Sequence, residues 1–403
     1  STNYNYIGIV PTDSTANFTN QDIFRADGAL SIDSDSSVIR GTIGTGSGDT
    51  NNTYQSSYGF DENDTIGIAI DCDTPQVTFY KNGTSIGTFP HTMQSNKSWV
   101  LFANDWANGA DFTGYILNAG QRTFKNSAPS GFKALCTTNL PTPTIADGSA
   151  HFDTVLYTSD SNSRTISGLN MSPDLVWSKR RSGAGRHVIT DSVRGVNKEL
   201  FPDRTSLERT STDGLTQFNS DGYVIGDDDG EYGWQASGAT FVNWAWDAGS
   251  STVTNTDGSL SASLRANPSC GFSIATVTYV SNVNETYGHG LNTAPEFVMA
   301  KNLDSASSWY CYHKSLGKDK YIVLNDSAAE GSLANSWGTS DPTSTLMGLR
   351  SGTSFGDGNT SVIYAFAPVA GYSAFGSYVG NGSTDGVFVH TNFRTAFIVV
   401  KRT

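Results

Sequence analysis

Residues 65–89, TIGIAIDCDTPQVTFYKNGTSIGTF, constrain the fold most because they divide into strands and turns almost without ambiguity. Residues 66–71 alternate isoleucine with small or polar side chains, the period of two that turns one face of a strand towards a core. A second alternating run, residues 77–81, ends at Asn82-Gly83, a pair that tolerates the positive φ angles of a tight hairpin turn. We therefore predict a β-meander here.

The meander and several later segments resemble the SPRY domain, a jelly-roll-like sandwich related to the concanavalin A lectins. The resemblance covers residues 5–136 and rests on residues 67–71, 77–83, 86–87, 99–102, 116–121, 124 and 131–133. It implies that residues 99–102 and segments between residues 116 and 133 form the last strands of the domain. Because that family has one or two strands before the segment equivalent to residues 6–10, we expect the N-terminal strands of the domain to be missing and the chain to be a fragment.

Beyond the prolines at 141 and 143, which favour an extended linker, the chain repeats itself. Residues 169–179, LNMSPDLVWSK, reappear as residues 291–301, LNTAPEFVMAK, and more loosely as residues 391–401. The flanking segments also correspond: 152–155 with 272–275 and 372–375, and 242–246 with 362–366. Apolar and aromatic positions persist between copies while polar ones drift, so the copies share the pattern of a β-rich core.

These observations predict an all-β chain: a SPRY/concanavalin-like β-sandwich followed by tandem β-sandwich modules. The predicted parts are the sandwich at residues 1–140, one repeat module at 141–260, a second at 261–370, and the start of a truncated third repeat at 371–403. We expect the incomplete third copy to be covered by neighbouring modules or by another chain, because it leaves a strand edge unpaired.

The repeats resemble a module of large virion proteins of marine bacteriophages, where it follows a SPRY or concanavalin-like domain. The segments that carry this resemblance lie between residues 145 and 403: SPDLVW, DSVRG, TSTDGLTQFNSDGY, HGLNTAPEFVMAKN and GSYVGNGSTDG. The resemblance implies a tail-fibre or appendage component, with threefold symmetry if the protein forms fibres.

The charge balance argues against nucleic acid and anionic membranes as partners. The chain has 25 basic and 38 acidic residues, a net charge of −13, whereas phosphate binding needs clustered Lys and Arg. Its longest apolar runs have the length of a strand, so we expect no membrane insertion.

The four cysteines show no metal-binding spacing: Cys72, Cys136, Cys270 and Cys311. We interpret them as small buried residues, with a Cys72–Cys136 disulfide as the alternative.

Two segments could bind ligands. Asn104, Asp105, Trp106 and Asn108 combine an aromatic ring with hydrogen-bonding groups, as in loops that contact sugars; alternatively, Trp106 closes the end of the sandwich. The second segment is the acidic run Asp227, Asp228 and Asp229, which could hold Ca²⁺, although we favour a solvated hairpin loop because the EF-hand order is missing. We predict no other cofactor.

The sequence offers no motif for catalysis. It has no paired acids spaced for glycoside hydrolysis, no nucleophile elbow, and no HExxH or HxH among its six histidines, so we interpret His289 as a turn residue. Trp244 and Trp246 are predicted core residues, while Trp234 and Trp309 could face either way.

We therefore expect a non-enzymatic structural protein of a virus particle, a tail-fibre or decoration component that contacts host surface glycans. Its other partners would be copies of itself or other virion proteins. Its location would be the particle surface, or otherwise secreted or at the cell surface. A bacterial adhesin is the alternative, a polysaccharide depolymerase is a further one, and an intracellular SPRY adaptor fits the tandem repeats poorly.

Overall fold

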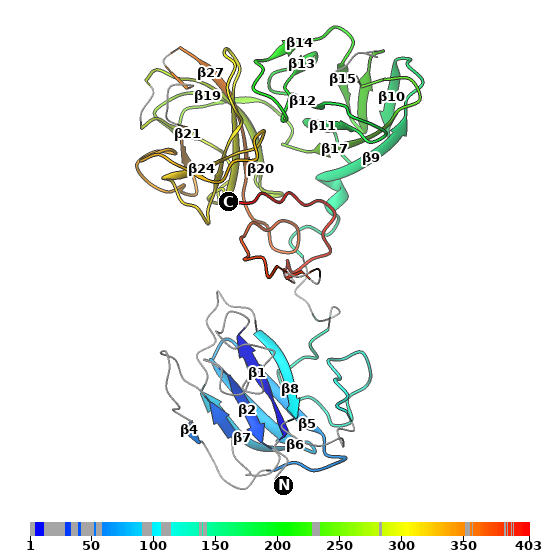
Figure 1. Cartoon of the computed structure of the whole chain (residues 1–403), viewed down its shortest axis with the longest axis vertical. Coiled ribbons are helices and arrows are strands. Elements are labelled where there is room, and N and C mark those ends of the chain that lie inside the picture. Colours follow the sequence, from blue (N-terminus) through cyan, green and yellow to red (C-terminus); the bar gives the residue numbers. More distant parts are fainter. Residues whose placement is uncertain are drawn as a thin grey trace. The chain divides into compact units, whose positions relative to one another are not determined.

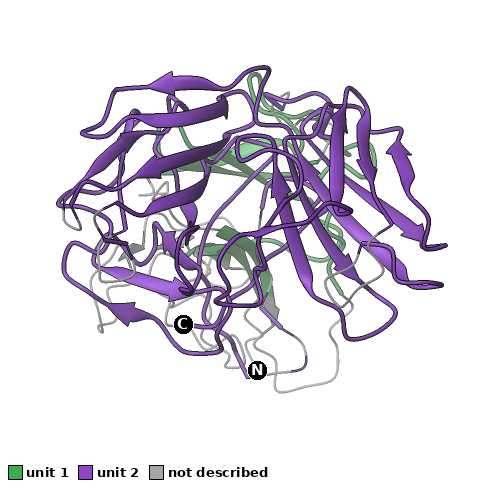
Figure 2. Cartoon of the chain, turned by 90° about the horizontal axis from the view of Figure 1, so that it is seen from above, with its two compact units in different colours: residues 1–141 green, residues 142–403 purple. Residues whose placement is uncertain are grey.

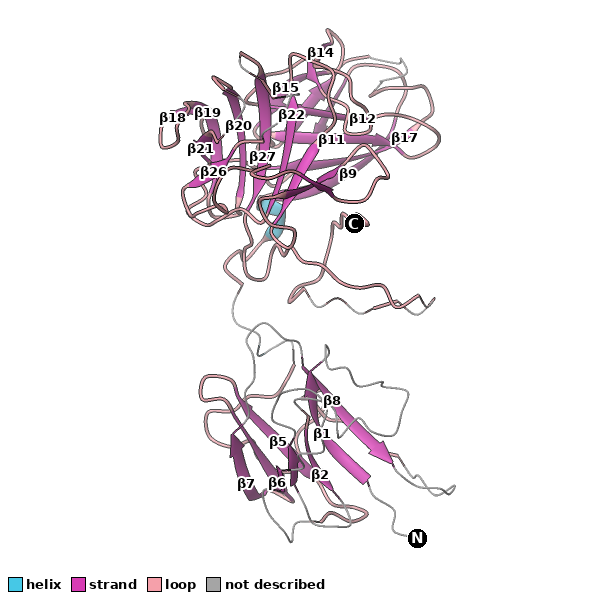
Figure 3. Ribbon diagram, turned by 60° about the vertical axis from the view of Figure 1, so that its left-hand side comes forward, coloured by secondary structure: helices cyan, strands magenta, loops and turns pink. Residues whose placement is uncertain are grey.

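In the computed structural model, almost all of the regular secondary structure in the described residues is β-strand (Figure 3). The structure describes residues 5–11, 29–33, 39–41, 52–53, 59–90, 99–105, 114–136, 139, 143–227, 234–281, 284–350, 355–356, 358–382, 384, 386–387, 389 and 391–403. The predicted all-β class is confirmed. No helix within these residues is long and apolar enough to cross a membrane. The chain divides into two compact units, residues 1–141 and 142–403, coloured separately in Figure 2.

Unit 1 packs two antiparallel sheets against each other. The larger sheet has the order β4-β3-β2-β1-β8 and the smaller one the order β5-β6-β7 (Figure 1). Residues of both sheets, among them Ile9 and Ile32 in one and Val77 and Phe79 in the other, form its buried core. The strands are β1 (Asn5–Pro11), β2 (Leu30–Asp33), β3 (Ile39–Gly41), β4 (Asn52–Thr53), β5 (Ile66–Asp71), β6 (Gln76–Lys81), β7 (Thr84–Pro90) and β8 (Trp99–Asp105).

The predicted meander is the small sheet of unit 1. Asn82 and Gly83, between β6 and β7, have φ angles of 50° and 85°, as a type I′ hairpin turn requires. The Asn82 side chain also holds the neighbouring loop, because its Oδ1 accepts from the Thr65 backbone N–H at 2.9 Å and its Nδ2 donates to Asp64 at 2.6 Å.

Of the predicted last strands of the sandwich, residues 99–102 lie in β8, but the prediction for residues 116–133 is wrong. The described residues 114–136 contain no strand, and Ile116 and Leu117 are exposed. The side chains of Asn118 and Gln121 satisfy the backbone locally: Asn118 Oδ1 accepts from the N–H groups of Gly120 and Arg122, and Gln121 Nε2 donates to the Leu117 carbonyl. These short-range hydrogen bonds replace those of a sheet.

Unit 2 begins with the helix η3 (Gly148–Ala150) and then a first module of two facing sheets, which we define as β9 to β17. One sheet has the order β12-β11-β17-β9 and the other β10-β16-β15, with Val176, Tyr223 and Ala245 in the core between them. The strands are β9 (Phe152–Thr158), β10 (Arg164–Ser167), β11 (Leu175–Arg180), β12 (His187–Asp191), β13 (Lys198–Glu199), β14 (Arg209–Thr210), β15 (Leu215–Asn219), β16 (Gly222–Ile225) and β17 (Thr240–Trp246).

The second module, β18 to β27, is built on one sheet of order β18-β19-β20-β27-β22-β23-β24-β25. The antiparallel pair β21-β26 and its loops pack on one face of this sheet. The strands are β18 (Val253–Asn255), β19 (Ala262–Asn267), β20 (Phe272–Thr278), β21 (Thr286–Gly288), β22 (Phe297–Asn302), β23 (Tyr310–His313), β24 (Lys320–Val323), β25 (Gly331–Ser332), β26 (Leu346–Gly348) and β27 (Thr360–Phe366).

The internal repeat is confirmed by strand pairing. The order β12-β11-β17-β9 in the first module matches β23-β22-β27-β20 in the second. The register matches as well, because Leu175 lies opposite Trp246 in one module and Phe297 lies opposite Phe366 in the other. The repeat therefore encodes a four-stranded sheet with a fixed register.

The two modules share a hydrophobic core. Leu175, Trp177 and Trp246 of the first module form one buried cluster with residues of the second, such as Phe272 and Tyr364. The central sheet of the first module is thus buried on both faces, and so is the part of the second module's sheet that β22 and β27 form. Unit 2 is a stack of sheets joined through apolar contacts.

Equivalent lysines show how this interface changes the surroundings of a repeated position. Lys179 Nζ donates to the Arg180 carbonyl at 2.9 Å, and Lys301 Nζ donates to the Asn302 carbonyl at 3.0 Å. Lys179 is half-buried and its second acceptor is the Gly185 carbonyl of its own module, whereas Lys301 is fully buried and its second acceptor is the Thr205 carbonyl of the first module. The local conformation repeats, and the contact between modules adds the burial.

Candidate functional site

The predicted sugar-binding loop lies mostly outside the described residues. Asn104 and Asp105 are the last residues of β8, the edge strand of the larger sheet of unit 1, where their backbones pair with Tyr6 and Asn5. Trp106 and Asn108 are outside the described part, as are the side-chain positions of Asn104 and Asp105. A sugar contact by this loop stays a prediction.

The predicted calcium site can be followed only in part. Asp227 is exposed just after β16, and Asp228 and Asp229 lie outside the described residues. Within the described residues, no group of three or more His, Cys, Asp and Glu side chains is arranged to hold a metal ion. Ca²⁺ binding by the acidic run therefore also stays a prediction.

The four tryptophans of unit 2 considered above and His289 pack in or against the hydrophobic cores. Trp246 is buried and Trp244 packs against the shared core, as predicted. Trp234 and Trp309 are also fully buried, and the Trp309 Nε1–H donates to the Phe201 carbonyl of the first module at 2.8 Å. His289 is buried just after β21; its Nδ1 accepts from the Leu291 N–H at 3.2 Å, and its Nε2 lies 3.1 Å from the Thr343 carbonyl.

A polar cluster surrounds the buried thiol of Cys270, where the two modules meet. Asp247 Oδ2 lies 2.9 Å from His151 Nδ1 and accepts from Asn267 Nδ2 at 2.6 Å, and Cys270 Sγ donates to the Asp247 carbonyl at 3.4 Å. Burial, together with the nearby Asp247 carboxylate, raises the pKa of Cys270 to about 12. A thiol with that pKa stays protonated near neutral pH, so this cluster does not present an activated sulfur nucleophile.

The candidate functional site is an open groove on the sheet of the second module. Along β20, Phe272 and Ile274 point into the shared core, and Thr276 and Thr278 continue the same face of the strand. In this part of the sheet the face is accessible, because Thr278 is exposed and Thr276 is half-buried. The groove is therefore the uncovered continuation of a surface that elsewhere packs against the first module.

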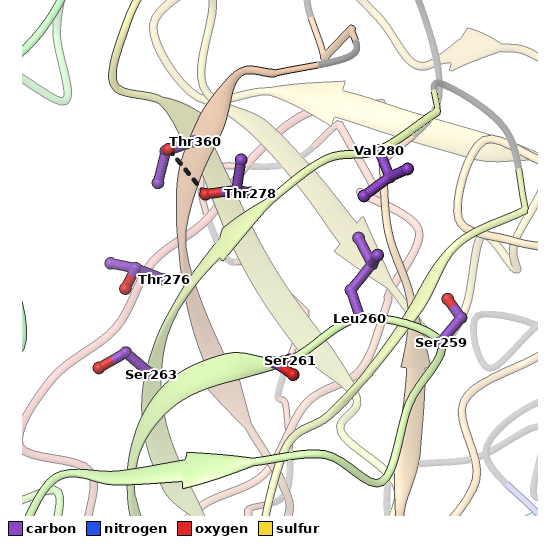
Figure 4. A pocket seen from close by; sticks show the side chains of 8 residues that line it. All are labelled: Ser259, Leu260, Ser261, Ser263, Thr276, Thr278, Val280 and Thr360. Atoms are coloured by element: carbon purple, nitrogen blue, oxygen red, sulfur yellow. Dashed lines mark hydrogen bonds between the residues drawn. The ribbon is translucent and has the colours of Figure 1, made fainter.

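Hydroxyl groups from neighbouring strands line this groove, as Figure 4 shows. Ser263 of β19 lies opposite Thr276, and Thr360 of β27 lies opposite Thr278, with 3.0 Å between the two threonine hydroxyls of the second pair. The groove has a volume of about 560 Å³, and the residues that line it are Ser259, Leu260, Ser261, Ser263, Thr276, Thr278, Val280 and Thr360.

The chemistry of the lining is neutral. Of the described residues that form the groove, none is charged, and six of the eight carry a hydroxyl. A hydroxyl can donate and accept, so such a surface can exchange hydrogen bonds with the hydroxyls of a sugar, while Leu260 and Val280 offer apolar contact to its C–H groups. The groove holds no acid, base or ligand set for a hard metal ion among these residues.

Sequence reasoning missed this groove although a signal was present. Ser261 and Ser263, and Thr276 and Thr278, stand at alternate positions, and the intervening residues Ala262 and Val277 are buried in the core. The pattern predicts a strand with a hydroxyl face. It does not show that faces from three strands meet in one depression, because that depends on the strand order.

Comparison with family models matches both units. Residues 6–113 match the SPRY domain, which confirms the family resemblance for unit 1 and limits it to a shorter segment than residues 5–136. Residues 147–403 match the model described as a domain of unknown function, DUF7483, which spans more than half of the chain. Neither the curated proteins nor the solved structures gave a match. This chain, a SPRY domain followed by two fused β-modules with a hydroxyl-lined groove, belongs to the DUF7483 family.

Proposed function

We propose that this chain is a non-enzymatic structural protein of a virus particle, a tail-fibre or decoration component, whose second module makes weak contacts with neutral glycans of a host surface. The virion assignment rests on the resemblance of the repeats, residues 145–403, to modules of bacteriophage virion proteins. The glycan part rests on one observation, the uncharged hydroxyl-lined groove on β19, β20 and β27.

The construction of unit 2 supports a role that needs rigidity. The modules are joined by a shared apolar core and by buried polar contacts, among them the ion pair between Arg265 of the second module and Asp174 of the first at 2.8 Å. A groove on such a sheet keeps its shape without a ligand, which lowers the entropy cost of binding. Many copies on one particle would convert weak individual contacts into firm attachment.

Binding can be tested by titrating the full chain with neutral oligosaccharides and following groove-residue amides by NMR. We expect affinities in the millimolar range, about −4 kcal/mol, for individual sites. Ser263→Arg should abolish the response because its side chain fills the exposed groove. Ser332→Arg, an equal change at an exposed position of the edge strand β25, should leave the response unchanged.

A response that survives Ser263→Arg, or that moves amides of other strands only, would contradict the groove as the binding site. Release of new reducing ends from the same oligosaccharides would contradict the non-enzymatic part and favour a depolymerase. Imaging of purified particles with antibody against the chain tests the virion assignment separately, and labelling confined to bacterial cell envelopes would favour the adhesin alternative.

A further inference from the structure

The hairpin loop between β11 and β12 carries the densest group of basic residues in the chain. Four of the 25 basic residues lie within residues 179–186, KRRSGAGR, which contain no acidic residue. Arg186 pairs with Asp203, whose Oδ2 lies 3.3 Å from the Arg186 Nη1. Arg180 and Arg181 have no carboxylate partner in the described part of the chain. Two guanidinium charges of the loop thus lack a counter-charge among these residues.

The loop is held in one conformation by the protein itself. Lys179 Nζ donates to the Gly185 carbonyl at 2.9 Å and so joins the two arms of the loop. The loop is also tied to β17, because the Arg181 N–H donates to the Thr240 carbonyl at 2.7 Å and the Ser182 Oγ accepts from the Thr240 N–H at 3.0 Å. A loop ordered in this way loses little conformational entropy when it binds a ligand.

The Arg180 side chain lies along this loop. A Cβ added at Gly185 would be 2.6 Å from the Arg180 Cβ, and one added at Gly183 would be 3.8 Å from the Arg180 Cζ. The stem therefore packs against residue 185, and the guanidinium lies beside residue 183. This guanidinium donates no hydrogen bond within the described residues, and of its nitrogens only Nε is a buried atom without a partner. The two Nη groups are thus open to solvent and to a ligand.

The equivalent loop of the second module has a different task. Asn302 and Leu303 stand there in the positions of Arg180 and Arg181. Asn302 Oδ1 accepts from the Asp304 backbone N–H at 2.8 Å, and Leu303 packs in the core shared by the modules. That loop closes a local turn and contacts the first module. The sheet common to both modules therefore forms without the two arginines, so their charge needs another explanation.

We propose that the loop of residues 179–186 binds a phosphate group through the Arg180 guanidinium, with Arg181 adding positive charge. A guanidinium donates two parallel hydrogen bonds to phosphate oxygens, and a phosphate charge of about −2 matches two arginines that lack a counter-charge. The net charge of −13 does not oppose this, because a single phosphate group responds mainly to the charges nearest to it. An extended polyanion would also meet the acidic remainder of the surface.

Titration of the full chain with sodium phosphate tests the proposal, with sodium chloride holding the ionic strength constant and NMR following the amides of residues 180–186. We expect saturable shifts of these amides. Arg180→Gln should weaken phosphate binding about tenfold, because it removes a charge-assisted pair of hydrogen bonds. Arg122→Gln, the same change at an exposed position of unit 1, should leave the affinity unchanged.

A second pair of variants keeps the net charge and changes only the position of Arg180. Gly185→Ala should displace the Arg180 stem and weaken phosphate binding several-fold, because the new Cβ would overlap the Arg180 Cβ. Gly183→Ala is the matched control, since its Cβ would make an ordinary contact with the guanidinium at 3.8 Å. It should bind phosphate as the wild type does.

Glucose 6-phosphate, inorganic phosphate and glucose distinguish the sources of the phosphate group. Tighter binding of glucose 6-phosphate than of inorganic phosphate would identify a sugar phosphate as the ligand, and equal affinities would identify the phosphate group alone. Glucose should cause no shift in the loop.

Shifts that grow linearly without saturation, or an unchanged affinity in Arg180→Gln or Gly185→Ala, would overturn the proposal. The groove on the second module is not involved. Ser263→Arg should therefore bind phosphate as the wild type does, whether or not the groove binds neutral glycans.

Discussion

The hydroxyl of Tyr364 in the second module donates a hydrogen bond of 2.7 Å to Oδ2 of Asp191 in the first. The same carboxylate oxygen accepts from Nε of Arg194 at 2.6 Å, and Arg194 Nη1 in turn contacts Glu208 at 3.0 Å. Both residues of the Tyr364–Asp191 pair are fully buried. Burial raises the pKa of Tyr364 well above its usual value, so the phenol stays neutral and acts as the donor. A buried network of hydrogen bonds and ion pairs thus joins the modules inside an apolar interface.

Replacing Tyr364 by Phe should lower the free energy of unfolding of unit 2 by about 1.5–3 kcal/mol, because a buried carboxylate loses a donor. Tyr287→Phe is the matched control: the Tyr287 hydroxyl is buried and has no hydrogen-bond partner in the described structure, so its removal should be neutral or stabilising. Urea unfolding followed by tryptophan fluorescence measures both, since six of the eight tryptophans lie in unit 2. Equal effects of the two substitutions would contradict the claim that the Tyr364–Asp191 hydrogen bond stabilises unit 2.

The buried Lys301 predicts a pH dependence of stability. Burial lowers the pKa of Lys301 to about 8 in the folded chain, against a usual value of 10.5. As the pH falls from 10.5 to 8, the unfolded state therefore binds the proton before the folded state does. The free energy of unfolding falls by about 3 kcal/mol over this pH range. Below pH 8 both states carry the proton, so this group no longer changes the free energy of unfolding. Stability should thus rise with pH between 8 and 10.5 more steeply in the wild type than in Lys301→Met.

The control for Lys301→Met is Lys179→Met, at the equivalent position of the first module. Solvent reaches the half-buried Lys179 side chain, so this change accounts for the loss of the aliphatic stem and of the two carbonyl contacts that each lysine makes. Denaturation midpoints of all three proteins at pH 7.5, 9 and 10.5 give the comparison. Parallel curves for the wild type and Lys301→Met would show that Lys301 stays charged when buried.

Local patterns in the sequence predicted the features that short-range interactions determine. The meander follows from alternation and from Asn82-Gly83, and the pairing of Leu175 with Trp246 repeats as Phe297 with Phe366 because the apolar pattern repeats. The prediction of a strand at residues 116–121 failed because the amide side chains of Asn118 and Gln121 offer the backbone a local alternative to strand pairing.

The contacts between modules could not be predicted from the sequence. Residues of β11 and β17 are apolar on both faces, which is compatible with burial against any second layer. Only the three-dimensional arrangement shows that this layer is the other module. For the same reason the hydroxyl groove was missed: Ser263 and Thr276 look like ordinary solvent-facing residues until β19 and β20 are known to be neighbours.

The cysteines make a prediction about chemical reactivity. The structure contains no disulfide among the four cysteines; Cys72 is exposed, and Cys270 and Cys311 are buried. Burial raises the pKa of both buried thiols to about 12. In timed alkylation at pH 8 with peptide mapping, Cys72 should react first, and Cys270 and Cys311 should react only in denaturant. Recovery of a Cys72–Cys136 cross-linked peptide under non-reducing conditions would instead establish the alternative pairing.

Gly214 should tolerate no larger side chain, because a Cβ there would lie 2.2 Å from Oε1 of Glu199. Glu199 is fully buried and cannot move without breaking its bonds to Trp234 Nε1 at 3.0 Å and to Arg209 Nη2 at 2.7 Å. Gly214→Ala should therefore lower the free energy of unfolding by about 1–3 kcal/mol, the usual cost of overpacking a core. Gly376→Ala, where a Cβ would meet nothing within 4 Å, should stay within about 0.5 kcal/mol of the wild type. Matching midpoints for the two variants in urea unfolding would mean that the Glu199 contacts do not hold the first module in this conformation.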